Sequence, residues 1–167
     1  IDDFIELISE KKESPKTIQI FNLYEAYMKV SKKKDFQSYS LFRNWSNMLL
    51  NDINDVDMSL AISDNVFKYL LEIQKLQTLS DDEAKTKLEF WKMIPEIVNE
   101  YKQTLLEKDN ANKGLCHLTA KENIDMFSNS YSDHTFIFIG LNSLSKSEEY
   151  IINYILENNN SKIYWDC

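Results

Sequence analysis

Hydrophobic residues recur every three to four positions along most of the chain, which is the spacing of one face of an α-helix. In the segment from Pro15 to Val30, for example, Phe21, Tyr24 and Met28 fall on one such face. Polar residues occupy most of the positions between them, as expected of a solvent-facing side. This periodicity predicts helices over residues 2–12, 15–30, 39–57, a stretch following 63–64, and 80–108.

Residues that typically begin helices support these boundaries. Ser14 followed by Pro15 is such a start, with the serine as N-cap and the proline at the first helical position. The segments Ser80–Glu83 and Thr119–Glu122 each match a capping box, in which a hydroxyl and a glutamate satisfy free backbone amides. The second of these boxes predicts a short helix that ends near Ser128.

A proline predicts an interruption within the helix over 80–108, and a glycine predicts where that helix ends. Pro95 lacks a backbone N–H and is therefore expected to kink or divide that helix. The polar segment Asp109–Gly114 is expected to end it, because Gly114 can adopt a left-handed backbone conformation.

The pattern changes after Ser132. His134–Ile139 is a short run of aromatic and β-branched residues, which predicts a buried strand. Ser145–Glu148 caps a further helix, and Lys162–Trp165 predicts a second strand. Strand, helix and strand in close succession are typical of a βαβ unit with parallel strands. Since a two-stranded parallel sheet is not stable by itself, we expect partner elements from sequence outside this chain.

These elements predict a mostly α-helical protein in two parts. Residues 1–130 are expected to form a helical subdomain, and residues 131–167 a small parallel α/β piece with the order strand, helix, strand. The chain starts at Ile1 and stops just after a predicted strand, so we interpret it as a piece of a longer protein.

Composition and charge narrow the classes of function. The chain has 167 residues, 43% of them hydrophobic, which is enough for one domain with a core. Only two glycines and two prolines occur, as expected of a helical protein. The formal net charge of −8 argues against a freestanding nucleic-acid-binding domain, which would be basic. Two cysteines make no disulfide framework and no segment is long enough to span a bilayer, so we expect a cytoplasmic protein without a membrane partner.

Metal-binding motifs are not found in the sequence. Cys116 and His117 are adjacent rather than spaced like metal ligands, and His134 stands alone, so we interpret them as ordinary semi-buried residues. An acidic cluster lacks the glycine and the bidentate acid of a calcium loop, and we interpret its members as helix-end acids. This cluster comprises Asp52, Asp55 and Asp57.

Phosphate-binding loops are not found either. Gly114 and Gly140, the only glycines, cannot form GxxxxGK[ST] or GxGxxG. We therefore predict no catalytic residue, no cofactor-binding residue and no metal ligand in this chain. A few basic side chains could neutralise phosphate charge, although the acidic balance makes tight binding by this chain unexpected. The candidate contacts to DNA are Lys32, Lys33, Lys34 and Arg43.

The segment Phe136–Glu148 resembles part of the motor domain of superfamily 1 helicases. In those enzymes the strand ends in an Asp-Glu pair that serves magnesium and the attacking water. Here Ile139 and Gly140 stand at the position of that pair, and Asn142 follows as a third degenerate position. This form is similar to the helicase-like half of AddB-type helicase–nucleases, which are PD-(D/E)XK nuclease family proteins that process DNA double-strand breaks.

The helical part of the chain is also similar to that family. Trp45–Asp57 resembles the family's stretch Trp-x-x-x-Leu-Leu-x-Asp-Phe/Ile-x-x-Ile/Val-Asp. Similar residues of the family's helical region are found at Ile1–Phe4, Phe90-Trp91, Tyr101-Lys102 and Gly114. The resemblance implies that residues 1–130 are an insertion bundle and that residues 131–167 belong to an incomplete helicase-like motor domain.

The resemblance implies a non-catalytic role as a scaffold or DNA-positioning region of a DNA-repair helicase–nuclease. It implies a parent exonuclease that uses Mg²⁺ in its nuclease region, with no cofactor in this chain. Implied partners are DNA, the remaining domains of the polypeptide and a helicase–nuclease partner subunit. Two alternatives stay open: an autonomous α-helical module for protein–protein contact, and a small enzyme that uses His117, His134 or the acidic cluster.

Overall fold

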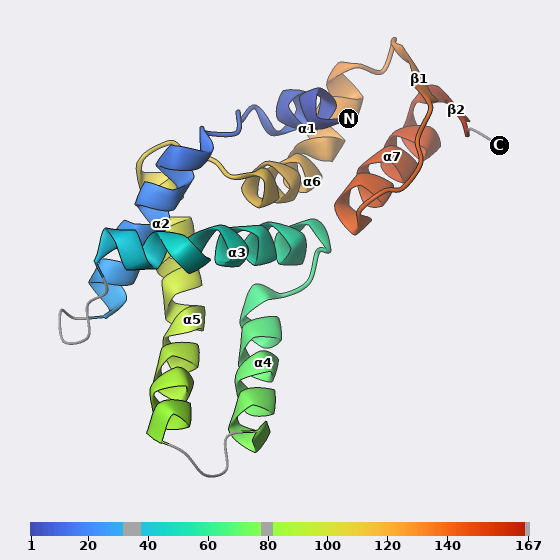
Figure 1. The fold of residues 1–167 in the computed structure, drawn as a ribbon. Coiled ribbons are helices and arrows are strands. Elements are labelled where there is room, and N and C mark those ends of the chain that lie inside the picture. The colour runs from blue at the N-terminus through green and yellow to red at the C-terminus, as the bar shows by residue number, and fades with distance from the viewer. Residues whose placement is uncertain (32–37, 78–81, 166–167) are drawn as a thin grey trace.

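The computed structural model describes residues 1–31, 38–77 and 82–165, with the backbone alone for 63–64, 74–77 and 82–90. Within these ranges the chain is mostly helical, with seven helices and two short strands (Figure 1). In chain order they are α1 (Asp2–Ser9), α2 (Lys16–Val30), α3 (Tyr39–Met58), α4 (Ser63–Gln77), α5 (Asp82–Glu107), α6 (Lys113–Ser130), β1 (Thr135–Ile139), α7 (Lys146–Asn158) and β2 (Asn160–Tyr164).

The two strands confirm the predicted βαβ unit. β1 pairs with β2 in parallel, with Thr135 opposite Asn160 and Ile139 opposite Tyr164, and α7 makes the crossover. The capping box at the start of α7 is present as expected, since the Ser145 side chain accepts from the backbone N–H of Glu148. The fold class predicted from the sequence, a helical bundle with a small parallel α/β piece, is therefore confirmed.

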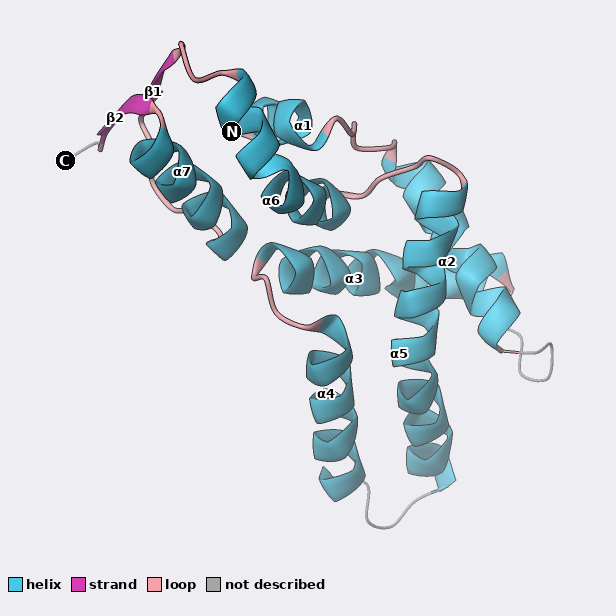
Figure 2. Cartoon of the chain, turned by 180° about the vertical axis from the view of Figure 1, so that it is seen from behind, coloured by secondary structure: helices cyan, strands magenta, loops and turns pink. Residues whose placement is uncertain are grey.

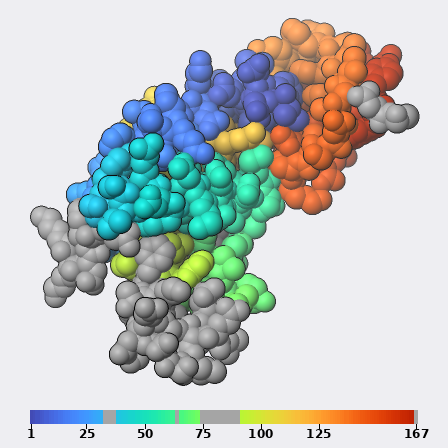
Figure 3. Space-filling view, viewed as in Figure 1, coloured from blue at the N-terminus to red at the C-terminus, as the bar shows by residue number. Residues whose placement is uncertain are grey.

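Buried hydrophobic residues form two clusters, and the helices that contribute to each lie in different parts of the molecule (Figure 2). One cluster joins α2, α3 and α5, with Phe67 from α4. The other joins α1, α6 and α7, and Phe136 and Phe138 of β1 pack against it. Leu115 of α6 contacts both clusters, and in the space-filling view α3 adjoins the end that contains α1 and α7 (Figure 3).

The connection from α1 to α2 contacts the connection from α5 to α6. The backbone N–H of Ser14 donates to the carbonyl of Ala111 at 2.9 Å, and the Ala111 N–H donates to Ser14 Oγ at 3.2 Å. The connection before α2 and the connection after α5 therefore lie side by side, and α2–α5 form an arm inserted between α1 and α6. The division at residue 130 stays a prediction, and the cluster around α7 includes residues of both predicted parts.

Two helix starts differ from the sequence-based expectation. α2 begins at Lys16 with Pro15 as its N-cap, so Ser14 does not cap it and instead holds the paired connections together. α6 begins at Lys113, well before Thr119, because Asn112 Oδ1 accepts from the backbone N–H of Leu115 at 3.1 Å. Asparagine is as strong an N-cap as serine, and here it precedes an uninterrupted helical pattern.

The predicted division of the helix at Pro95 and its predicted end at Gly114 are wrong. Pro95 lies inside α5, which is not divided there, because Ile94, Ile97 and Val98 around it are buried in the core and hold both halves. Gly114 lies inside α6 rather than at the end of α5, and the left-handed residue that follows α5 is Asp109, with φ 51°.

The prediction that the first strand is buried is wrong for one of its two faces. Phe136 and Phe138 face Phe4 of α1, whose ring lies 5.7 Å from that of Phe138. Ile137 and Ile139 on the other face are 57% and 69% exposed. The difference arises because helices cover only one face of this sheet among the described residues, so side chains alternate between core and solvent.

Two predicted features lie outside the described residues: the start of the capping box at Ser80-Asp81, and Lys32, Lys33 and Lys34. In the part of the chain that the structure describes, each helix is too short or too polar to cross a membrane.

Candidate functional site

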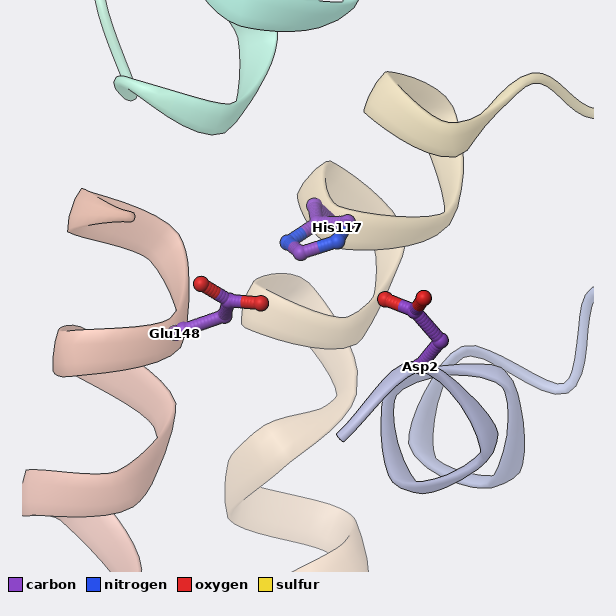
Figure 4. Close-up of side chains that lie close together, drawn as sticks. All are labelled: Asp2, His117 and Glu148. Atoms are coloured by element: carbon purple, nitrogen blue, oxygen red, sulfur yellow. The ribbon is translucent and has the colours of Figure 1, made fainter. Parts of the chain in front are cut away.

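Three ionisable side chains converge where α1, α6 and α7 meet (Figure 4). They are Asp2, His117 and Glu148, and one nitrogen or oxygen atom of each lies within 4.8 Å of the others. The imidazole of His117 lies between the two carboxylates, with one ring nitrogen turned towards each of them. We define these three residues as the α1–α6–α7 cluster.

The two carboxylates reach the cluster because each belongs to the first turn of a helix. Asp2 opens α1, and Glu148 is the third residue of α7. Acidic residues are favourable there, since the free backbone N–H groups and the helix dipole place positive charge at a helix start. Glu148 Oε2 also accepts from the backbone N–H of Ser145 at 2.6 Å and from Ser145 Oγ at 2.8 Å. The capping box thus fixes Glu148 in place.

His117 is the buried centre of the cluster, with only 1% of its surface exposed. Its Nδ1 lies 2.7 Å from Ser147 Oγ, which fixes the plane of the ring. Its Nε2 is buried and has no hydrogen-bond partner among the described residues. An unsatisfied buried polar atom costs about 1–3 kcal/mol, so this nitrogen is the feature of the cluster that most requires an explanation.

A positive charge lies on the Asp2 side of the ring. The Lys113 ammonium lies 2.9 Å from Asp2 Oδ1. Its hydrogen bond holds the pKa of the Asp2 carboxyl below its ordinary value. Burial lowers the pKa of His117, which favours the neutral imidazole. The cluster therefore combines two carboxylates, one ammonium and one neutral ring that has a lone pair to offer.

This arrangement can hold a cation or pass a proton, because it joins a neutral imidazole to two carboxylates. The side chain of Asp2 is 67% exposed, so the cluster is open to solvent on the α1 side. Glu148 is 7% exposed and closes the α7 side.

The sequence-based interpretation of His117 as semi-buried is wrong, since the residue is fully buried. Cys116, its neighbour, is buried as well, but its Sγ lies 3.9 Å from the carbonyl oxygen of Lys11 and takes no part in the cluster. His134 is exposed and packs edge-on against the Tyr131 ring. The convergence could not be read from spacing, because more than a hundred residues separate Asp2 from the other two members.

The acidic residues Asp52, Asp55 and Asp57, near the C-terminal end of α3, do not converge on one point. Asp57 is buried, and its Oδ1 lies 2.6 Å from Lys102 Nζ of α5. Asp52 and Asp55 are exposed on the surface of the same helix. Asp57 therefore serves the packing of α3 against α5.

The degenerate motif positions lie at the end of β1 and in the loop that follows it. Gly140 adopts φ 72° and its N–H donates to the carbonyl of Tyr164 at 3.3 Å. Asn142 borders a groove of about 300 Å³ together with Glu149 and Trp165. Glu149 forms an ion pair with Lys146 across one turn of α7.

Of the candidate DNA contacts, the described one is Arg43, which is exposed on α3. Other basic residues of the helical arm are engaged with acids. Lys29 Nζ lies 2.7 Å from Glu100 Oε1, and Lys108 forms an ion pair with Glu25.

Comparison with known proteins adds no relative: no family model, no curated protein and no solved structure matches this chain.

Proposed function

We propose that this chain is a non-catalytic scaffold region of a DNA-repair helicase–nuclease that processes double-strand breaks. The observation that carries the proposal is the βαβ unit whose first strand ends at Ile139 and Gly140. This unit has the strand, capped helix and parallel strand expected of one repeat of a motor domain. At its strand end, an exposed aliphatic side chain and a glycine occupy the positions that resemble the acidic pair of superfamily 1 helicases.

Loss of that pair supports a role without ATP hydrolysis. A nucleotide motor needs carboxylates there to hold Mg²⁺ and to position the attacking water. Ile139 offers neither function, and Gly140 has no side chain. Glu149, the acid that borders the adjoining groove, is already paired with Lys146.

The uncovered face of the sheet supports a scaffold role. Ile137, Ile139 and Tyr164 are each more than half exposed. Two parallel strands rarely stand alone, because such sheets are normally covered on both faces. Further domains of the same polypeptide would cover this face of the sheet. A Mg²⁺-dependent nuclease region and a partner subunit belong to the same proposal.

Direct DNA contact by this chain is a minor part of the proposal. The net charge is −8, and Lys29 and Lys108 are paired with acids. Arg43 on α3 and the lysines at 32–34 remain the candidates for a positioning contact, which would weaken as salt is raised.

The coding sequence on the 3′ side of this segment tests the proposal directly. We expect it to encode the Asp and Asp/Glu-x-Lys pattern of a PD-(D/E)XK nuclease. The chain itself, incubated with ATP, Mg²⁺ and double-stranded DNA, should release neither phosphate nor nucleotides. A reading frame without the nuclease pattern, or phosphate release by the purified chain, would refute the proposal.

One observation favours a second candidate, an autonomous module for protein–protein contact. Leu41 and Met48, seven residues apart on α3, are 57% and 66% exposed on one side of the helix. A reading frame that ends close to residue 167 would favour this alternative over the scaffold.

A further inference from the structure

We propose that Asp2, His117 and Glu148 bind one divalent transition-metal ion of the zinc class. The ion would join α1, α6 and α7 at the point where these helices meet. This inference does not rest on the proposed function, because it depends only on the α1–α6–α7 cluster.

The orphaned nitrogen of His117 is the first argument. Its Nε2 is buried without a hydrogen-bond partner among the described residues, and its ring lies between two carboxylates. A proton donor or a metal ion would satisfy this lone pair, and the two carboxylates that flank the ring (Figure 4) have no proton to donate when ionised. A cation on Nε2 would satisfy this lone pair, and one oxygen of each carboxylate lies within 4.8 Å of a nitrogen of the same ring.

Ser147 prepares the ring for such an ion. With Nδ1 protonated and donating to Ser147 Oγ at 2.7 Å, the lone pair of the neutral ring is at Nε2. Metal-ligating histidines typically have a partner of this kind on their other nitrogen, which sets the tautomer and the orientation of the ring. Ser147 would therefore act as a positioning residue.

The donor set decides the class of ion. Imidazole is a good ligand for zinc and its transition-metal neighbours, whereas Mg²⁺ and Ca²⁺ prefer sites made of oxygen atoms alone. One imidazole and two carboxylates give three protein ligands, which leaves a fourth position for water.

The distances require only a small closure. Ligand atoms around a tetrahedral zinc lie about 2.0–2.2 Å from it and therefore about 3.3–3.6 Å from one another. The present atoms lie within 4.8 Å of each other. Asp2 can make the movement, because its side chain is 67% exposed and is tied to the Lys113 ammonium rather than packed in the core.

Lys113 competes with the ion for Asp2. Its ammonium occupies Oδ1 of that carboxylate, so binding of a cation must displace it. Lys113 therefore provides a second test. Removal of its charge should strengthen metal binding, whereas the same change would loosen the cluster if the ion pair between Lys113 and Asp2 alone held it together.

The test is titration of the metal-free chain of residues 1–167 with ZnCl₂ by calorimetry, and with CoCl₂ by visible absorption. We expect one ion per chain and the intense visible bands of four-coordinate cobalt. Asp2→Asn should weaken binding by more than about tenfold, the loss that even outer-shell changes can cause at metal sites. Asp3→Asn, which removes an exposed acid from the same turn of α1, is the matched control and should bind as the parent chain does.

Two further variants sharpen the result. His117→Gln should abolish the cobalt bands, and Lys113→Met should tighten zinc binding about threefold or more. If His117→Gln fails to fold by circular dichroism, Asp2→Asn and Lys113→Met decide the question without it. The proposal is overturned if zinc does not saturate a single site, if Asp2→Asn binds as tightly as Asp3→Asn, or if His134→Ala or Cys167→Ser removes the binding.

Discussion

Gly114 of α6 packs closely against Asn54 and Asp57 of α3. A Cβ atom added to it would lie 2.8 Å from the Cβ of Asp57 and 3.2 Å from the Cα of Asn54. Because the second of these atoms belongs to the backbone, it cannot move aside by a change of rotamer. The residue is thus small for reasons of packing between helices, and not because the chain turns there.

We expect Gly114→Ala to destabilise the protein. Alanine gains about 1 kcal/mol of helix propensity over glycine, but overpacking against α3 costs about 1–3 kcal/mol, so the net change is a loss. Urea unfolding followed by circular dichroism measures it. Asn129→Ala, at an exposed position of the same helix, is the control and should leave the midpoint unchanged or raise it.

Cys116 should be chemically inert in the folded protein. Burial raises the pKa of its thiol to about 11, so little thiolate forms at neutral pH. In a Cys167→Ser background we expect alkylation by iodoacetamide at pH 7.5 to be slower by about tenfold or more in buffer than in urea. Equal rates in the two conditions would contradict the buried position of this thiol.

Only part of the α1–α6–α7 cluster could be predicted from the sequence. Ser145 and Glu148 were recognisable as a capping box, because a cap depends on residues three positions apart. The role of His117 was not, since its environment is built by Asp2 and Ser147 from two other helices. Only tertiary packing brings such residues together.

At the scale of elements, the side chains of β1 alternate between a packed face and an exposed face. Phe136 and Phe138 point to the aromatic cluster around Phe4, while Ile137 and Ile139 point to solvent. A continuous apolar run in the sequence gives no alternation from which the sidedness could be predicted. The strand itself was predictable, because aromatic and β-branched residues are enriched in strands.

We expect Phe138→Ala to cost about 2 kcal/mol of unfolding free energy, because the half-buried ring loses its contacts with Phe4. Ile137→Ala, the matched substitution on the opposite face, should change it by about 0.5 kcal/mol or less. Thermal unfolding of both variants, side by side, measures the difference. Equal losses would mean that both faces of the strand are covered in solution.

At the scale of the whole molecule, a polar contact links the two clusters of buried residues. Asn54 Oδ1 of α3 accepts from Asn112 Nδ2 at 2.7 Å and from the backbone N–H of Gly114 at 2.9 Å. The second bond satisfies one of the free amides at the start of α6. Asn54 thus ties the helical arm to the end of the molecule that carries the βαβ unit.

Asn54→Ala should therefore lower the unfolding free energy by about 1–3 kcal/mol, because two donors lose their acceptor. The measurement is equilibrium unfolding in urea. Asn51→Ala, on an exposed face of α3 one turn earlier, should leave stability within about 0.5 kcal/mol of the parent. A loss of the same size in both variants would mean that the bonds to Asn112 and Gly114 are not its cause, since helix propensity alone favours alanine over asparagine.

Most helices and the parallel βαβ unit were predictable, since both depend on local periodicity and on short connections. How the helices pack was not. α1 lies against α6 rather than against α2, its neighbour in the chain, because Ile5 and Ile8 share a cluster with Ile124 and Phe127. Contacts between segments so far apart leave no periodic trace in one sequence.

The side-by-side connections at Ser14 and Ala111 have an evolutionary consequence. Because the inserted arm begins and ends at neighbouring points, its length can change without altering the separation of the two ends to which it is joined. Relatives of this protein should therefore differ in size mainly within α2–α5, and least across α1, α6 and the strand pair.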